Sequence, residues 1–164
     1  MPHIQSIPSE RADASPSVCF ALGAEEADGR LKGGLPSGRL HETISGTAED
    51  DAATAAFTLL LALRAMRAGG SLLWIRHDKG ERRSGRLDPH GLAAIGADPA
   101  RLILAKAPTE KAALQAGLDA ARCAGLGALI IEIWGRPREL DLTATRKLAF
   151  AAEQSGVTAF LLRI

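Results

Sequence analysis

AGLGALIIEI, residues 124–133, contains the most apolar run of the sequence. Residues 128–133 of this run are predicted to form a β-strand, and polar and apolar side chains do not alternate along it. A strand without that alternation is typical of a parallel sheet that is covered on both faces. The stretch therefore predicts a buried central strand in an α/β domain.

Similar apolar runs recur on both sides of this strand, separated by segments of helical length. Because parallel strands need long crossovers, this spacing predicts an α/β fold with a mostly parallel sheet and helices on both faces. Strands are predicted over residues 40–44, 71–75, 101–105 and 157–162. Helices are predicted over residues 48–68, 89–95, from 109 to the glycine at 125, and 142–155.

The helix predicted over residues 48–68 has clear start and stop signals. Thr47 can cap its N-terminus, acidic residues fill its first turn, and two glycines at 69–70 end it. Its apolar residues leave almost no polar face, so we expect it to be buried on more than one side. These residues are Phe57, Leu59, Leu60, Leu61, Leu63 and Met66.

Length and composition suit one domain of ordinary size: 164 residues, 46% of them hydrophobic, with a net charge of +1. Residues 1–17 are rich in Ser and Pro and are predicted to be a disordered lead-in, with the core domain at 18–164. Without a signal sequence or a membrane-spanning run, the chain is expected to be cytoplasmic, with no membrane partner. Cys19 and Cys123 are expected to be buried or incidental thiols, and the four histidines show no metal-ligand spacing.

In an open α/β sheet, the first strand-to-helix turn is where a phosphate would bind, because the helix N-terminus offers free N–H groups. Here that turn reads SGTAEDDAAT, residues 45–54, and contains neither lysine nor arginine. Glu49, Asp50 and Asp51 occupy the helix start, where their carboxylates satisfy the amides and would repel a triphosphate. The turn therefore predicts a degenerate phosphate loop, with no cofactor and no enzymatic activity.

Several blocks of the sequence resemble RecA recombinases at matching spacing. GGLPSGRLHE, residues 33–42, is similar to the segment that leads into their phosphate loop. ALIIE, residues 128–132, resembles their Walker B strand, with Glu132 at its acidic position. Further matching blocks lie at residues 72–75, 87–89 and 95–98.

The departures from RecA support the loss of nucleotide chemistry. In an ungapped alignment, Asp51 stands at the position of the RecA lysine and Ala52 at that of the magnesium-binding hydroxyl. Asp78 lies near the position of the catalytic glutamate. The chain also stops at Ile164, where RecA continues into a DNA-contacting loop, so DNA binding is expected to be at most weak and non-specific.

Within the RecA-like group, the chain resembles the ImuA family, the accessory proteins of bacterial induced mutagenesis. The resemblance runs from Phe20 to the C-terminus and is carried by residues 124–128, 142–148 and 151–158. It implies a non-enzymatic assembly role in damage-induced translesion synthesis. The implied partners are ImuB, an inactive Y-family polymerase homologue, and through the complex an error-prone DnaE-type polymerase, with RecA a further candidate.

Two alternatives stay open at this point. A cell-division inhibitor resembling SulA would also be RecA-like without a phosphate loop, and its partner would be the tubulin-like FtsZ. A residual ATPase that uses an unusual loop is the second alternative. A polymerase-like partner, an FtsZ partner or micromolar nucleotide binding would distinguish these functions.

The remaining polar and aromatic groups are expected to have structural roles. The basic stretch at residues 76–86 could contact a phosphate backbone, but two acidic residues interrupt it and no aromatic residue interleaves, so a solvated loop is the favoured interpretation. Trp74 and Trp134 are expected to be core or sheet-end residues.

The partner is predicted to dock on an edge strand. RecA protomers assemble when an N-terminal element of one subunit adds to the core of the next, and the polar first residues here do not resemble that element. The acceptor strand would be residues 101–106, beside a pocket near Leu73 and Ile75. The predicted partner-binding residues are Leu102, Leu104, Leu114 and Leu118.

Overall fold

A computed structural model describes residues 18–164, and the lead-in predicted over residues 1–17 lies outside the described residues. Five strands form the central sheet: β3 (Leu40–Ile44), β4 (Ser71–His77), β5 (Leu102–Ala107), β6 (Leu126–Ile133) and β7 (Thr158–Arg163). Their order is β3-β7-β6-β4-β5, and every neighbouring pair is parallel. The α/β fold with a parallel sheet is confirmed, and β5 lies at one edge as predicted.

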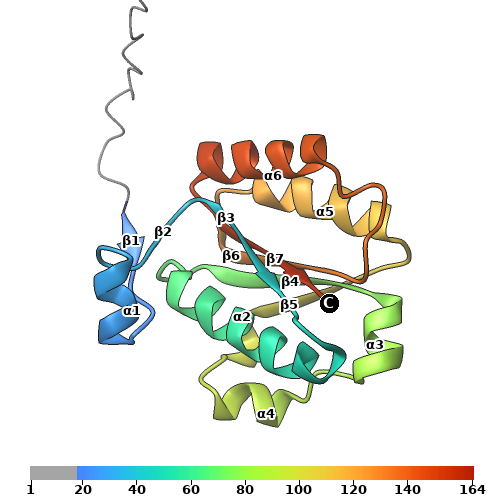
Figure 1. The fold of residues 1–164 in the computed structure, drawn as a ribbon, viewed down its shortest axis with the longest axis horizontal. Coiled ribbons are helices and arrows are strands. Elements are labelled where there is room, and N and C mark those ends of the chain that lie inside the picture. Colours follow the sequence, from blue (N-terminus) through green and yellow to red (C-terminus); the bar gives the residue numbers. More distant parts are fainter. Residues whose placement is uncertain (1–17) are drawn as a thin grey trace, which may run out of the picture.

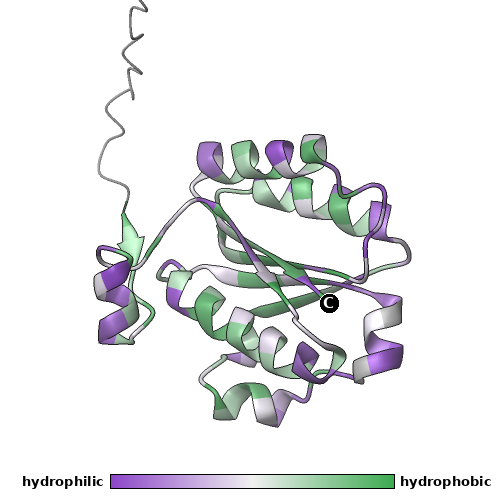
Figure 2. Cartoon of the chain, in the orientation of Figure 1, coloured by the Kyte–Doolittle hydropathy of each residue, from purple (hydrophilic) through white to green (hydrophobic). Residues whose placement is uncertain are grey.

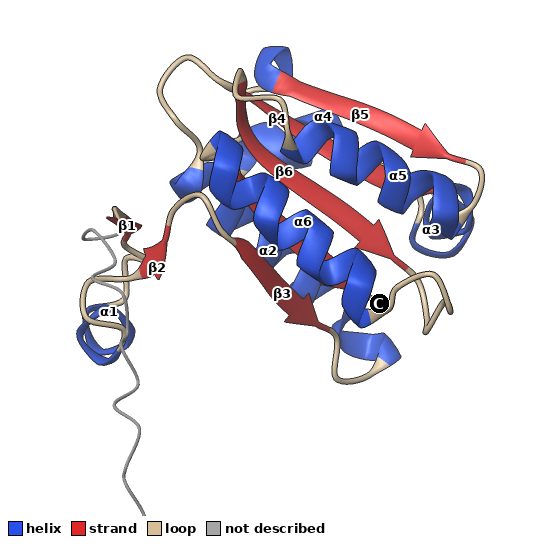
Figure 3. Cartoon of the chain, turned by 90° about the horizontal axis from the view of Figure 1, so that it is seen from above, coloured by secondary structure: helices blue, strands red, loops and turns tan. Residues whose placement is uncertain are grey.

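Helices cover both faces of this sheet (Figures 1 and 3). α2 (Asp51–Ala65) and α4 (Pro89–Ala94) lie on one side, and α5 (Glu110–Ala121) and α6 (Leu142–Ser155) lie on the other. Two short 3-10 turns, η1 (Ala48–Asp50) and η2 (Pro99–Arg101), precede α2 and β5. The predicted helix over 142–155 and the predicted strand over 40–44 have the observed bounds, and the other predicted elements differ from the observed ones by a few residues.

β6 explains why its sequence shows no alternation. Leu129 and Ile131 belong to the cluster beneath α5 and α6, whereas Ala128 and Ile130 belong to the cluster beneath α2 and α4. All four are fully buried, because each face of the sheet has its own layer of helices. Figure 2 shows the same pattern, with hydrophobic strands between helices of mixed hydropathy.

The sequence did not predict the elements at the amino-terminal end of the described chain. β1 (Cys19–Phe20) pairs antiparallel with β2 (Leu35–Pro36), and α1 (Glu25–Arg30) connects them. Phe20 anchors this unit to the core, with its ring centroid 6.3 Å from that of Phe160. Among the described residues, no helix is long and apolar enough to cross a membrane.

The prediction that α2 is buried on more than one side is wrong. α2 exposes half of Phe57 and 44% of Leu60, because only one side of the helix packs on β6 and β7. Its regular part also ends at Ala65, short of residue 68. Cys19 and Cys123 are both exposed and neither forms a disulfide, so of the two expectations for them, buried or incidental thiols, only the second fits.

Candidate functional site

The carboxyl ends of the parallel strands β3, β4 and β6 lie at the same end of the sheet, where ligands bind in open α/β proteins. The turn after β3 leads into η1 and α2, β4 ends at His77, and β6 ends just beyond Glu132. Helix α3 (Asp78–Ser84), which follows β4 directly, lies at the same end of the sheet. Any nucleotide chemistry of this fold would take place here.

The acidic side chains at the start of α2 are engaged by their own turn. Ser45 Oγ donates to the carboxylate of Asp51 at 2.6 Å. The backbone N–H and the hydroxyl of Thr47 both donate to Asp50, at 3.1 and 2.9 Å. Thr47 is thus the N-cap residue just before η1, at the predicted cap position, and the helix start already carries two bonded carboxylates. Negative charge occupies the position where a phosphate would gain from the helix N-terminus.

Glu132 is the centre of a buried hydrogen-bond network. Its carboxylate is 1% exposed, and its Oε2 accepts from Trp74 Nε1 at 3.0 Å and from Arg76 Nε at 2.8 Å. Its Oε1 accepts from Trp134 Nε1 at 2.8 Å. A buried carboxylate needs such donors, because removing the charged group from water without them would cost on the order of several kcal/mol. Both oxygens are therefore committed to protein donors.

Helix α3 closes over this network. A Cβ added to Gly80 would lie 2.4 Å from Glu132 Oε1 and 2.7 Å from Trp134 Nε1, so a glycine is needed for this approach. The Arg83 guanidinium lies 5.7 Å from the centroid of the Trp134 ring, within cation–π range. The network and the helix above it thus fill the space in front of the acidic strand.

The interpretation of residues 76–86 as a solvated loop is wrong. Residues 78–84 form α3, the Arg76 side chain is only 11% exposed, and His77 is buried beside Glu110. β4 runs two residues farther than predicted, and Arg76 pairs there with Glu132 of the adjacent strand. The exposed arginines of the stretch are Arg82, Arg83 and Arg86.

Ion pairs connect α3 to the edge strand. Glu81 contacts Lys106 of β5 and pairs with Arg86 at 2.7 Å. The hydrogen bond from Lys106, followed by that from Arg86, holds the pKa of Glu81 below its usual range. Nearby, the backbone N–H of Gly91 lowers the pKa of Asp88, which caps α4. On β3, at the far edge of the sheet, burial lowers the pKa of His41.

A hollow of about 190 Å³ remains beside Glu132, between α2 and α4. Its walls are mostly aliphatic and include Ala55, Leu59, Leu92 and Ile95. Ligand pockets usually measure about 300–1,000 Å³ and offer convergent polar groups. Within the described residues no group of three His, Cys, Asp or Glu could hold a metal ion. The hollow is smaller than that range, and its charged lining residues, Asp51, Arg76 and Glu132, already take part in hydrogen bonds within the protein.

The four leucines predicted to bind a partner do not form one surface. Leu102 packs on the cluster beneath α2 and α4, and Leu104, 48% exposed, borders a hollow with Arg76 and Arg86. Leu114 and Leu118 instead line the groove between α5 and α6.

Alternation along β5 explains the separation of these residues. Ala105 and Ala107 pack on the cluster beneath α5 and α6, so Ile103 lies on that face while Leu104 lies on the other. Ile103 is 49% exposed and is the half-exposed apolar side chain on the α5 face of the edge strand. It was not among the residues predicted from the sequence.

The partners of Glu132 were also missed, although the sequence contained a signal for them. Trp74 and Arg76 stand two residues apart on β4, and Glu132 and Trp134 stand two residues apart at the end of β6. Side chains two apart share a face, and β4 pairs with β6. Adjacent strands thus bring two indoles, a guanidinium and a carboxylate together. Trp74 is a core residue as expected.

Comparisons with known proteins bear on the family and the fold of the chain. No family model matches the chain. Over 151 residues, 90% of the chain, it is 34% identical to protein ImuA of Caulobacter vibrioides, in each of two strains. The chain spans 58% of the length of these relatives. The crystal structure of SulA from Pseudomonas aeruginosa superposes with a TM-score of 0.53 at 20% identity, covering 76% of this chain and 96% of SulA. At that identity the likeness concerns the RecA-like fold alone.

Proposed function

The chain is homologous to the ImuA proteins, and on that premise we propose that it is a non-enzymatic assembly protein of damage-induced translesion DNA synthesis. Its direct partner would be an ImuB-type, polymerase-like protein, which brings an error-prone DnaE-type polymerase into the complex. RecA is a further candidate partner, and the complex would work in the cytoplasm.

One observation carries the non-enzymatic part of this proposal: the carboxylates at the nucleotide position of the fold accept hydrogen bonds from the protein itself. Asp51 is bonded to Ser45, and Glu132 is saturated by donors from Trp74, Arg76 and Trp134. A carboxylate in that state cannot orient water or a magnesium ion without breaking the network. These bonds support the proposal that the chain keeps the fold without its nucleotide chemistry.

The open edge of β5 supports the assembly part. β5 pairs with β4 on one side, and no strand within residues 18–164 pairs with its other side. An exposed edge is a template for an added strand, and proteins usually cover it. A strand supplied by the partner would complete the sheet, with main-chain bonds for affinity and side-chain contacts for specificity.

We expect no binding of magnesium-ATP or ADP. Calorimetric titration should give no saturable heat up to about 1 mM ligand, which corresponds to a free energy weaker than about −4 kcal/mol. Asp51→Lys alone should not create binding, because the small apolar hollow and the saturated Glu132 remain. Saturable micromolar binding by the wild type would favour a residual ATPase. A gain of binding by the single variant would mean that the hollow and the Glu132 network are no barrier to a nucleotide.

Co-purification distinguishes the proposed role from that of a cell-division inhibitor. The tagged chain, mixed separately with the purified ImuB-type protein and with FtsZ of the same bacterium, should retain the first and not the second. FtsZ is tested because the fold superposes on that of SulA. Retention of FtsZ alone would overturn the proposal.

A further inference from the structure

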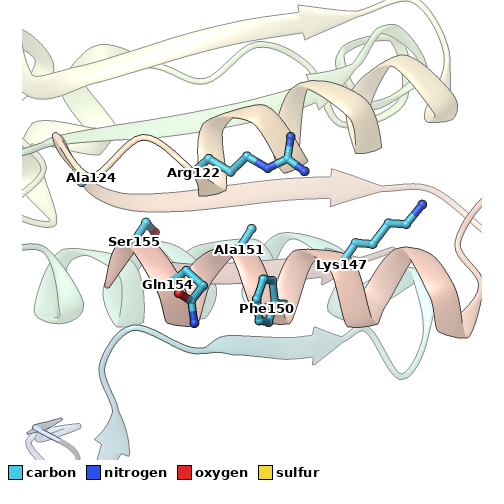
Figure 4. A pocket seen from close by; sticks show the side chains of 7 residues that line it. All are labelled: Arg122, Ala124, Lys147, Phe150, Ala151, Gln154 and Ser155. Atoms are coloured by element: carbon cyan, nitrogen blue, oxygen red, sulfur yellow. The ribbon is translucent and has the colours of Figure 1, made fainter.

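A groove runs between α5 and α6 on the face of the molecule away from α2. At one end it widens into a hollow of about 360 Å³, and a second hollow of about 300 Å³ follows along the same two helices. Lys147 borders both hollows, and the second one is also lined by Glu139 and Asp141. The larger hollow is lined by Arg122, Ala124, Lys147, Phe150, Ala151, Gln154 and Ser155 (Figure 4).

The larger hollow combines an exposed aromatic side chain with a cationic rim. Phe150 is 65% exposed, which is unusual for a large aromatic residue in mid-helix. Arg122 comes from the end of α5, and Lys147 extends from α6 toward α5 (Figure 4). Among the residues that line this hollow there is no aspartate or glutamate.

These cations have little local neutralisation. Within the described residues no hydrogen bond or ion pair engages the Lys147 ammonium, and Arg122 reaches only Asp119, at 3.6 Å between exposed groups. Glu153, the one acid within α6, is paired with Arg39. The acids that share a hollow with Lys147, Glu139 and Asp141, line the second hollow and not the larger one. Positive charge next to an apolar floor therefore faces solvent, and it would gain from a carboxylate that arrives with an apolar side chain.

We propose that the larger hollow of this groove is a docking site for an acidic segment of another protein. An apolar side chain of the segment would pack on Phe150 and Ala151, and a carboxylate would lie within reach of Arg122 and Lys147. The site is separate from the β5 edge, since α5 lies between them (Figure 3). The inference does not rest on the proposed function, and it would hold whether the direct partner of the chain is an ImuB-type protein or FtsZ.

Cys123 offers a direct readout, because it is exposed and lies between Arg122 and Ala124 at the rim. In a Cys19→Ser background, an environment-sensitive fluorophore on Cys123 would report occupancy. The probes are short acetylated peptides in which glutamates flank a leucine and a phenylalanine, and the same peptides with lysines instead. The acidic probe should bind at least about tenfold more tightly than the basic one, and about tenfold less tightly when salt rises from about 50 to about 200 mM.

Matched variants locate the binding. Phe150→Ala and Lys147→Glu should each weaken the acidic probe by about tenfold or more, and Lys147→Glu should reduce the preference for acid over base. Arg146→Glu is the control, because Arg146 is exposed at the adjacent position of α6 and lines neither hollow, so binding should stay within about twofold.

Three results would overturn the proposal. They are equal binding of the two probes, no binding up to about 1 mM, and equal losses in Arg146→Glu and Lys147→Glu. Sedimentation of the unlabelled chain tests whether a second copy of the chain occupies the groove instead. Self-association that Phe150→Ala abolishes would make the groove an interface between two copies.

Discussion

Replacing Glu132 with leucine is expected to lower the free energy of unfolding by about 3–5 kcal/mol, as found when one partner of a buried ion pair is removed. The substitution leaves the Arg76 guanidinium, 11% exposed, without its carboxylate. It also leaves the indole N–H groups of Trp74 and Trp134 without the acceptor that they share. Urea denaturation followed by circular dichroism would measure the change in midpoint.

Companion variants separate the charge from the shape. Glu132→Gln keeps the volume but turns one acceptor into a donor that faces another donor, and should cost about 1–3 kcal/mol. Arg76→Met combined with Glu132→Leu should be less destabilised than the sum of the two single variants, because the double variant buries no charge. Glu26→Gln, in an exposed pair with Arg30, is the control and should change stability by less than about 1 kcal/mol. A Glu132→Leu protein as stable as that control would show that the network does not hold this edge together.

The strands and the long helices could be predicted because their signals are local. Apolar runs of strand length, separated by capped helices, leave few arrangements besides a parallel sheet with helices on both faces. Asp141 and Thr109, for example, cap α6 and α5 through side-chain bonds to Ala144 and Ala112. Such caps are visible in the sequence as a polar residue just before an apolar periodic segment.

Helix α3 could not be predicted, because it depends on tertiary contacts. The segment DKGERRS contains a glycine and has no apolar face, so local preference opposes a helix. It is held by the close approach of Gly80 to Glu132 and by the stacking of Arg83 on Trp134. For α2 the limit was different: apolar residues all round the helix could not reveal that Phe57 and Leu60 lie on its solvent side.

For the candidate docking residues, the strand was predicted but the face on which each side chain lies was not. That residues 101–106 form an edge strand was inferred from the resemblance to RecA, but the choice of Leu104 ignored the alternation of side chains along the strand. Ile103 lies on the α5 face beside Ala105, whose neighbours are apolar. Leu104 lies on the other face, where Arg76, Glu81 and Lys106 border the same hollow. An apolar anchor of a partner strand therefore fits the Ile103 face better.

Ile103→Asp is accordingly expected to weaken binding of the ImuB-type partner by at least about 30-fold, the effect of losing an interface hot spot of about 2 kcal/mol. Leu104→Asp is the matched control, since it places the same charge on the same strand at equal exposure, 48% against 49%, but on the opposite face. It should change the affinity by less than about threefold. Binding would be measured by titration calorimetry after circular dichroism has shown both variants folded.

The pattern of the two variants decides between three arrangements. A loss confined to Ile103→Asp supports strand addition with the anchor against α5. Equal losses in both would mean that the partner covers the whole edge without a preferred face, and a loss confined to Leu104→Asp would move the anchor to the face bordered by Arg76 and Arg86. If both folded variants bind as tightly as the wild type, β5 is not the docking edge, although the homology to ImuA and the bonded state of Glu132 would be unaffected.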